Sequence, residues 1–221
     1  MKVSIKKIGK SSLILIGFFF TYALIGTYFI GFSNNETIKQ YIENAVQFVM
    51  CIGLIFLFNK ELKEDLTHFK KTSFQKFLKY LLIYLFAFFI SSLINNTIYN
   101  HFEILPSNEI AVRKFIKAFP INGVLSAGLL APFYEEIIIR LNLKNIFKRK
   151  WTFIIFSGIL FGSFHMISAM SSIELYYILP YSILGICLSY IYCDSEAIYT
   201  SIGFHAINNL IQILLIFGGK I

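Results

Sequence analysis

Two adjacent glutamates and an arginine lie in the run Ala131-Pro-Phe-Tyr-Glu-Glu-Ile-Ile-Ile-Arg140, after an apolar stretch. A charged side chain at membrane depth is costly, so it is retained mainly where it is paired or functional. On a helix, residues four apart share a face and neighbours point about 100° apart. We therefore expect an ion pair between Glu136 and Arg140, with Glu135 pointing elsewhere and open to chemistry. The alternative is an ordinary helix end that places all three charges at the water interface.

Two of the four histidines, His165 and His205, lie well inside apolar stretches. Asn209 follows His205 by four residues, so the two side chains are expected on one face of a helix. A histidine of this kind, taken alone, is more typical of a hydrogen-bonded packing residue. Three apolar segments that each carry polar groups are harder to explain, because an unpaired polar group in hydrocarbon is costly. We expect them to converge with Glu135 on one wet cavity that faces away from lipid.

The residue types in this set indicate hydrolysis. A carboxylate beside a histidine can take a proton from water, and a second histidine with an amide can stabilise a developing oxyanion. The sequence has no His-Glu-x-x-His zinc helix, no Gly-x-Ser-x-Gly turn and no well-placed aspartate for a serine triad. Peptide-bond cleavage by an activated water therefore fits best. Two histidines and a glutamate are also a ligand set for zinc with an open position, and the spacing leaves that chemistry open.

The composition predicts an integral membrane protein. The 221 residues are 57% hydrophobic and 14% charged, whereas soluble domains are about 25% charged, and the mean hydropathy is +0.68. A net charge of +8 raises the question of nucleic acid. The basic residues cluster between apolar runs, however, as in the cytoplasmic loops of membrane proteins. We therefore expect a lipid bilayer as the environment and no nucleic-acid partner.

We expect an all-α fold, a polytopic transmembrane helix bundle of about seven spans. The seven stretches are Ser11–Phe32, Tyr41–Phe58, Tyr80–Asn100, Phe119–Ile139, Trp151–Ser171, Leu175–Cys193 and Ala197–Phe217. The first is too long for the apolar part of a signal peptide, so we interpret it as a retained helix. A re-entrant piece near Asn108–Phe119 would change the number of spans.

The connecting segments set the orientation. Ser33–Gln40 is a polar turn, part of Asn59–Lys79 is an amphipathic interfacial helix, and a short surface helix is expected in the outer loop at Asn108–Lys117. With a cytoplasmic N-terminus, fifteen of the twenty Lys and Arg residues lie on the cytoplasmic side, in the first ten residues, Asn59–Lys79 and Arg140–Lys150. The positive-inside rule therefore favours a cytoplasmic N-terminus, an external C-terminus and a Glu135 near the cytoplasm.

Smaller features concern packing. Pro132 removes a backbone hydrogen bond one turn before Glu135, which predicts a kink or local opening there. Gly158-x-x-x-Gly162 lets helices approach closely, and we favour packing within the chain over oligomerisation. Cys51, Cys187 and Cys193 have no metal-ligand spacing, so we interpret them as small buried hydrophobes.

Three motifs together resemble a known family. They are Glu135-Glu136-x-x-x-Arg140, Phe161-x-x-x-His165 and His205-x-x-x-Asn209, in this order on the three apolar segments that carry motifs. They resemble the CAAX-protease and bacteriocin-processing family, also called CPBP or Abi, which includes the Ras-converting CAAX endopeptidases. The similarity covers about Phe119–Leu210. The family often has an aromatic residue before the arginine and a glycine after it, where this chain has Ile139 and Leu141.

The resemblance implies a glutamate-dependent intramembrane endopeptidase. Glu135 and His165 would activate water, and His205 and Asn209 would form the oxyanion hole. Glu136 and Arg140 would support the site. No cofactor is required by this reading, and zinc remains the alternative. Residues 1–118 would supply N-terminal helices and loops, and residues 119–217 the catalytic core, within one integrated domain.

The expected substrate is a small peptide or a membrane-anchored protein, cut near the cytoplasmic face of a bacterial plasma membrane by a multi-pass protein. Bacteriocin or pheromone processing, or self-immunity, is the function that the resemblance favours. Cleavage of prenylated CAAX tails is a further use within the family. Two other classes remain open: a non-catalytic immunity or scaffold protein, and a small transporter in which the buried acid and histidines relay protons. The oligomeric state is not predicted.

Overall fold

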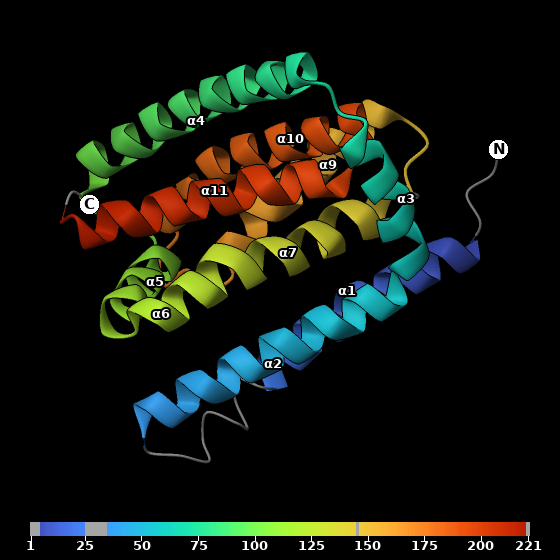
Figure 1. The fold of residues 1–221 in the computed structure, drawn as a ribbon. Helices are drawn as coiled ribbons and strands as arrows, with labels where there is room; N and C mark the ends of the chain where they lie inside the picture. Colours follow the sequence, from blue (N-terminus) through green and yellow to red (C-terminus); the bar gives the residue numbers. More distant parts are fainter. Residues whose placement is uncertain (1–4, 25–34, 145, 220–221) are drawn as a thin grey trace.

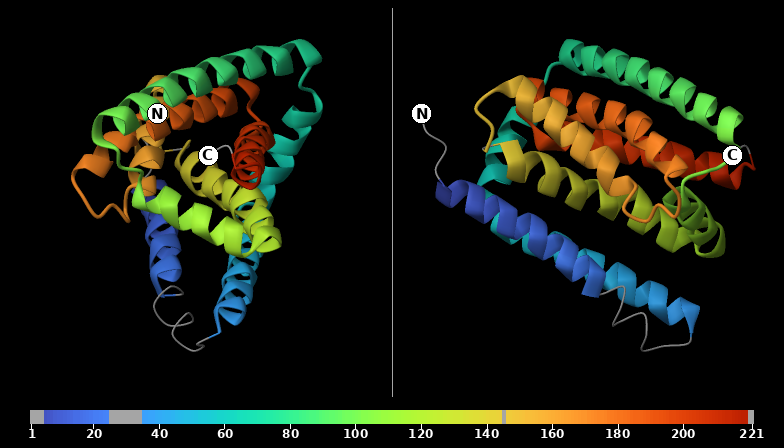
Figure 2. Two further views of the ribbon diagram at one scale, coloured as in Figure 1. Left: turned by 90° about the vertical axis from the view of Figure 1, so that its left-hand side faces the viewer. Right: turned by 180° about the vertical axis from the view of Figure 1, so that it is seen from behind.

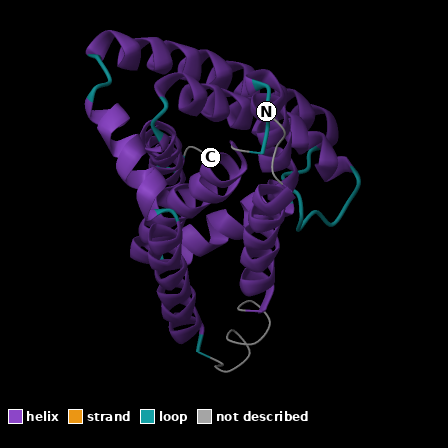
Figure 3. Ribbon diagram, turned by 90° about the vertical axis from the view of Figure 1, so that its right-hand side faces the viewer, coloured by secondary structure: helices purple, strands orange, loops and turns teal. Residues whose placement is uncertain are grey.

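The computed structural model describes residues 5–24, 35–144 and 146–219, and every regular element in these ranges is a helix (Figure 3). The elements are α1 (Ile5–Leu24), α2 (Glu36–Leu57), α3 (Asn59–Lys70), α4 (Phe74–Phe102), α5 (Ser107–Ala118), α6 (Pro120–Gly123), η3 (Val124–Leu130), α7 (Ala131–Glu136), η4 (Ile137–Leu141), α8 (Asn142–Lys144), α9 (Lys150–His165), η5 (Ile173–Tyr177), α10 (Ile178–Ser195) and α11 (Ile198–Phe217).

The long elements run side by side as a bundle (Figure 1). Helices α6, η3, α7, η4 and α8 follow one another without a break and form a single rod, which we call the motif helix, residues 120–144. The motif helix, α9, α10 and α11 form the centre, and α4 covers α10. Helices α1 and α2 extend from the other side and lie apart from one another (Figure 2). The prediction of an all-α bundle is therefore confirmed, and these elements are consistent with about seven spans.

The surface of the bundle suits a bilayer. Four stretches of the described chain are long and apolar enough to cross a membrane: Glu36–Leu57, Phe74–Phe102, Ile173–Ser195 and Ile198–Phe217. Helix α4 illustrates the pattern. It buries Tyr80 and Tyr84 against α10 and leaves Phe86 and Phe89 more than 60% exposed. Because such a face would be unfavourable in water, the chain is a multi-pass membrane protein.

Helix α2 begins earlier than the apolar pattern predicts. The side chain of Asn35 accepts hydrogen bonds from the backbone N–H groups of Thr37 and Ile38, and this cap starts the helix at Glu36. The prediction of a polar turn is therefore wrong for Glu36–Gln40. Residues 25–34, which include the end of the first predicted span and the start of that turn, lie outside the described residues.

Helix α9 ends at His165, six residues before the predicted end of the fifth span. The prediction that His165 lies well inside a helix is therefore wrong, since it is the last helical residue. The segment that follows has partners that favour a turn. Glu174 accepts hydrogen bonds from the backbone N–H groups of Met170 and Ser107, at 3.1 and 2.7 Å. These bonds tie the connection to the start of α5.

The motif helix also differs from its predicted span. It continues to Lys144 instead of ending near Ile139, so the acidic motif lies within a helix and not at its end. Two π-helical segments, η3 and η4, flank α7, whose second residue is Pro132. The predicted opening of the helix near Pro132 is found as η3, in the turns that precede it. Such π segments are frequent at functional sites.

Glycines allow α9 and α10 to touch. A Cβ atom at Gly158 would lie 2.3 Å from the Ile186 side chain, and one at Gly162 would lie 2.3 Å from Ser182 Oγ. From the other helix, a Cβ at Gly185 would lie 2.9 Å from the carbonyl oxygen of Gly158. The Gly-x-x-x-Gly pattern thus serves contact within the chain, as the packing interpretation predicts. The three cysteines are unpaired, with Cys51 and Cys187 buried.

Charged side chains gather at the end of the bundle that holds α3. Asp194, at the end of α10, accepts a hydrogen bond from Lys79 at 2.8 Å and lies 3.9 Å from Lys150. Asp65 of α3 accepts from the backbone N–H of Ile198 at 3.0 Å and so caps α11. Arg140 is not part of this end, because it is fully buried. Its place in the predicted cytoplasmic loop is wrong, so the sequence segments expected on the cytoplasmic side hold fourteen Lys and Arg residues and not fifteen.

Candidate active site

Arg140 occupies the centre of the bundle, one turn beyond the two glutamates. Its guanidinium donates to Glu136 Oε1 at 3.0 Å, to Ser189 Oγ at 3.2 Å and to the carbonyl oxygen of Gly185 at 3.1 Å. Its Cζ atom lies 4.6 Å from the centre of the Phe161 ring. The predicted ion pair is therefore present. The water-interface alternative is wrong, because both Glu136 and Arg140 are 0% exposed.

His205 lies between the two glutamates. Its Nδ1 is 3.0 Å from Glu136 Oε1, and its Nε2 is 3.9 Å from Glu135 Oε2. Because the carboxylate paired with Arg140 accepts hydrogen bonds, the Nδ1 of His205 carries the hydrogen in this contact. The Nε2 then faces Glu135 and donates when the ring is charged.

The two carboxylates have different surroundings. The Glu136 side chain is 0% exposed and is held by Arg140 and His205, whereas that of Glu135 is 24% exposed. Neighbours on a helix point about 100° apart, which is why one acid enters the buried network and the other borders it. The division of the pair into a held and an accessible carboxylate agrees with the sequence prediction.

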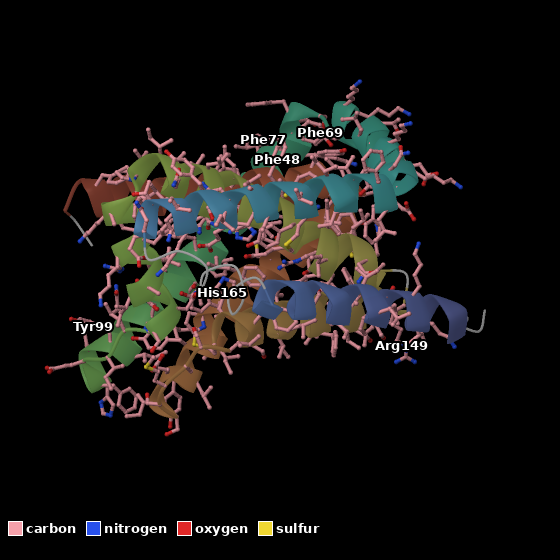
Figure 4. The ribbon with its side chains drawn as sticks, turned by 90° about the horizontal axis from the view of Figure 1, so that it is seen from below. Phe48, Phe69, Phe77, Tyr99, Arg149 and His165 are labelled. Atoms are coloured by element: carbon pink, nitrogen blue, oxygen red, sulfur yellow. The ribbon has the colours of Figure 1, made fainter. Side chains whose placement is uncertain are left out.

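His165 reaches the site from the end of α9. Its Nδ1 lies 2.9 Å from the carbonyl oxygen of Phe161, which can only accept, so Nδ1 carries the hydrogen. In the neutral ring Nε2 is then an acceptor, as a general base requires. The imidazole stacks on the ring of Tyr181, with centroids 4.5 Å apart. Seen from below, His165 is visible between the ribbons of α1 and α2 (Figure 4).

One aromatic side chain connects the parts of the site. The ring of Phe161 lies 4.4 Å from that of His165 and 5.4 Å from that of His205, centroid to centroid. It also receives the Arg140 guanidinium on its face. Glu135 and His205 are both electrostatic neighbours of His165. The motif helix, α9 and α11 therefore bring Glu135, His165 and His205 together around Phe161, and this convergence was expected from the sequence.

Asn209 lies one turn beyond His205 on α11. Its Nδ2 donates to the carbonyl oxygen of Ala127 in η3 at 2.8 Å, and its Oδ1 accepts from Asn208 at 3.3 Å. One amide hydrogen is thus used to hold α11 against the π-helical segment. The second hydrogen of the same nitrogen is the one that an oxyanion would use.

Sequence reasoning missed several contributors. Ser189 supports Arg140 and receives a hydrogen bond from Ser157 at 2.8 Å. The carbonyl oxygens of Gly185 and Ala127 each accept from a motif side chain. Serines within apolar runs are a weak signal that can point to Ser157 and Ser189. A backbone carbonyl has no side-chain signal, so Gly185 and Ala127 could be found only from the fold.

The zinc alternative requires three ligands in one place. In residues 5–24, 35–144 and 146–219, no three His, Cys, Asp or Glu side chains are grouped as a metal ion needs. The Nδ1 atoms of His165 and His205 are engaged by Phe161 and Glu136, which leaves the Nε2 of each ring open. Zinc therefore stays the alternative chemistry, and the reaction proposed for this site is written without a metal.

The site lies inside the bundle and not at the end of its helices. Glu135 precedes Lys144, the last residue of the motif helix, by nine residues, which is about 13 Å along a helix at 1.5 Å per residue. His205 follows the start of α11 at Ile198 by seven residues, or about 10 Å. The acidic motif is therefore further from a helix end than the sequence alone indicated.

Comparison with known proteins gives one match. Residues 117–211 match the family model described as Rce1-like, type II CAAX prenyl endopeptidase Rce1-like. That segment contains all three motifs, so the resemblance inferred from them is confirmed. The match supports a membrane-embedded protease of the CAAX type. No curated protein and no solved structure matches the chain.

Proposed function

We propose, from the Rce1-like match of residues 117–211, that this membrane protein is a glutamate-dependent endopeptidase that cuts its substrate within the bilayer. The observation that carries the proposal is the placement of His205 between a buried, ion-paired Glu136 and a partly exposed Glu135. A purely structural ion pair would need one carboxylate, and the second would be costly at this depth.

In the proposed reaction, Glu135 and the Nε2 of His165 orient a water molecule and Glu135 takes its proton. The hydroxide adds to the peptide carbonyl carbon, and the oxyanion that forms accepts hydrogen bonds from His205 Nε2–H and Asn209 Nδ2–H. Glu135 then returns the proton to the leaving nitrogen as the C–N bond breaks. The proton taken from water thus leaves on the amine product, and the hydroxyl oxygen leaves in the carboxylate.

Glu136 and Arg140 hold other residues of the site in position. Glu136 holds the Nδ1–H of His205, which fixes the ring with its Nε2 toward Glu135. Arg140 in turn neutralises Glu136, and Ser189 and Gly185 hold Arg140 in place. These residues would be needed for activity without touching the substrate.

The proposed substrate is a small peptide or a membrane-anchored protein that presents an extended segment inside the bilayer. Precursors of small secreted peptides, such as bacteriocins or pheromones, are the class we favour in a bacterial plasma membrane, for processing or for self-immunity. A prenylated CAAX tail is the second candidate, and the description of the matching family favours it.

The test uses purified protein in liposomes with two fluorogenic peptides, one carrying a prenylated CAAX tail and one carrying an unprenylated membrane anchor. Mass spectrometry identifies the bond that is cut. Cleavage that disappears in Glu135→Gln supports the proposal. If neither peptide nor a co-expressed precursor is cut, the protein is a binding or immunity protein that retains the fold. If Glu135→Gln cuts equally well, the assignment of Glu135 as the base is wrong.

A further inference from the structure

Helix α2 carries a row of amide side chains on one face. Gln40, Asn44 and Gln47 are spaced four and three residues apart, so they share that face. Asn44 is 8% exposed and Gln47 is 4% exposed, whereas Phe48 and Val49 are 57% and 65% exposed. The amides therefore point into the bundle while apolar side chains face the lipid. An apolar helix has no need of such a row for packing alone.

Two of these amides have unmet hydrogen-bonding capacity. Asn44 Oδ1 and Gln40 Oε1 are both buried and accept no hydrogen bond from any described residue. A buried amide oxygen without a donor is costly, and ordered water is the usual partner for such a group. A water molecule is the smallest partner that could satisfy either oxygen, whereas a segment of peptide would need far more room.

The row leads toward the site. Gln47 Oε1 accepts from Ser126 Oγ of η3 at 2.7 Å, and the next residue of η3, Ala127, accepts from Asn209 Nδ2 at 2.8 Å. The π-helical segment is thus in contact with amides of α2 and of α11. Asn209 is one turn from His205, which lies 3.9 Å from Glu135. Polar groups therefore follow one another from Gln40 to the acidic motif.

Helix α2 and the motif helix keep a constant register along this route. Gln47 pairs with Ser126, and Cys51 Sγ lies 4.0 Å from the carbonyl oxygen of Leu130, each 79 residues further along the chain. The same offset places Asn44 beside Gly123, which packs closely on Ile116 of α5. The unpaired oxygen of Asn44 therefore lies at the α2 face that packs on the motif helix.

We propose that Gln40, Asn44 and Gln47, with Ser126 and Asn209, bind a file of ordered water that supplies the site from the end of the bundle that holds α5. This rests on the proposed function, since hydrolysis consumes one water for each bond cut. The inlet is opposite to the basic end of the bundle, so the water would come from the external side. In this role Asn44 binds water and does not touch the substrate.

Hydration can be measured without any peptidase assay. In a protein lacking Cys51, Cys187 and Cys193, Asn44→Cys is compared with Val49→Cys, which lies little more than one turn away on the lipid face. A small neutral methanethiosulfonate reacts only with a thiolate, which requires contact with water. Asn44→Cys should react several-fold faster, and equally so when Glu135→Gln is also present. Equal rates at the two positions would overturn the proposal and leave the amides as links between helices.

The second measurement is kinetic. Asn44→Leu removes the unpaired amide at similar volume, so the fold should be as stable as before or more stable. We expect kcat to fall while KM is unchanged, with Val49→Leu as the matched control. An unchanged kcat, or a rise in KM alone, would contradict a water file, the latter by indicating substrate contact. If the unsubstituted protein cuts nothing while Asn44→Cys is labelled rapidly, the proposed function fails and the water file stands.

Discussion

Glu135 and Glu136 are neighbours in the chain, but their side chains have different surroundings and different proposed roles. Glu136 is enclosed by Arg140 and His205, and its charge is neutralised within the protein. Glu135 points about 100° away and retains 24% of its side-chain exposure. A carboxylate that must accept a proton from water needs that accessibility, whereas one that orients a histidine needs enclosure. The difference leads to opposite expectations for the same substitution.

Replacing Glu135 by glutamine should abolish activity and spare the fold. The loss of a general base predicts a fall in cleavage of about 10²-fold or more, with little change in thermal unfolding in detergent. Glu136→Gln should lower both the cleavage rate and the melting temperature, because removal of one partner from a buried ion pair costs about 3–5 kcal/mol. The decisive comparison is the melting temperature of the two variants. Equal melting temperatures with equal activity losses would show that the carboxylates are not divided in this way.

Activity should survive thorough treatment with a zinc chelator. In the proposed reaction the water is activated by Glu135 and His165, which supply a base and an orienting acceptor without a Lewis acid. The measurement is the cleavage rate after dialysis against the chelator, with a known zinc peptidase treated in parallel as the control. Loss of activity that zinc alone restores would favour the metal-assisted reaction instead.

At the scale of elements, the contact between α9 and α10 sets the position of His165 and Phe161. Gly162→Ala would place a methyl group 2.3 Å from Ser182 Oγ and 2.5 Å from the carbonyl oxygen of Ile178. Overpacking of this kind costs about 1–3 kcal/mol, so the melting temperature and activity should both fall. Gly203→Ala in α11 is the matched control, because nothing lies within 4 Å of its added carbon. A neutral Gly162→Ala would show that the helices are less closely packed than described.

Asp65 links α3 to the helix that carries His205 and Asn209. Burial raises the pKa of its carboxyl above the ordinary value, although the hydrogen bond from Ile198 opposes the shift. Since the folded-state pKa is raised, the stabilisation from the protonated form is full below about pH 4 and is lost as the pH rises through the folded-state pKa.

Asp65→Asn retains an acceptor for the helix N-terminus and cannot ionise. Its melting temperature relative to the unsubstituted protein should therefore increase as the pH is raised from about 4 to 7. Asp65→Ala cannot ionise either but lacks the acceptor, so it should be less stable than Asp65→Asn by about 1 kcal/mol at every pH. Melting curves over this range distinguish the two effects. A pH-independent difference between the asparagine variant and the unsubstituted protein would show that Asp65 does not titrate as burial predicts.

Most helices could be predicted from hydropathy because burial in lipid or protein imposes apolar runs of a fixed length. Two ends could not. Helix α9 stops at His165 because Glu174 and Ser107 give the next segment its partners, and the motif helix continues past Ile139 because Arg140 finds Glu136, Ser189 and Gly185. Each reason lies in another part of the chain, so a local pattern cannot contain it.

The candidate site was predictable to the extent that its chemistry is in side chains. The apolar runs contain a carboxylate, two histidines and an amide, which stand out there. Because unpaired polar groups are costly in hydrocarbon, these side chains are expected to converge. The supports of the site were not predictable in the same way. Phe161 belongs to a sequence motif, but the motif does not show that its ring contacts both histidines, and Ala127 contributes only a carbonyl oxygen. These contacts depend on the fold and have no signal in a local pattern.

At the scale of the whole molecule, the two ends of the bundle differ in charge and composition. One end holds α3, the Asp194 cluster with Lys79 and Lys150, and the exposed Lys70 and Lys148. The other holds Asn35 at the start of α2, together with α5 and the ion pair between Arg113 and Glu109. By sequence, the segments expected at the first end hold fourteen Lys and Arg residues and those expected at the second hold five, once Arg140 is placed inside. The asymmetry predicts one orientation in the membrane.

Cysteine accessibility in intact cells tests this orientation directly. In a protein without Cys51, Cys187 and Cys193, a membrane-impermeant thiol reagent applied outside should label Asn35→Cys and spare Lys70→Cys and Lys148→Cys. All three positions are exposed in the structure, so unequal labelling reports the side of the membrane and not burial. Permeabilised cells supply the control, in which all three should react. External labelling of both lysine positions would reverse the orientation, and the proposed water file would then open to the cytoplasm.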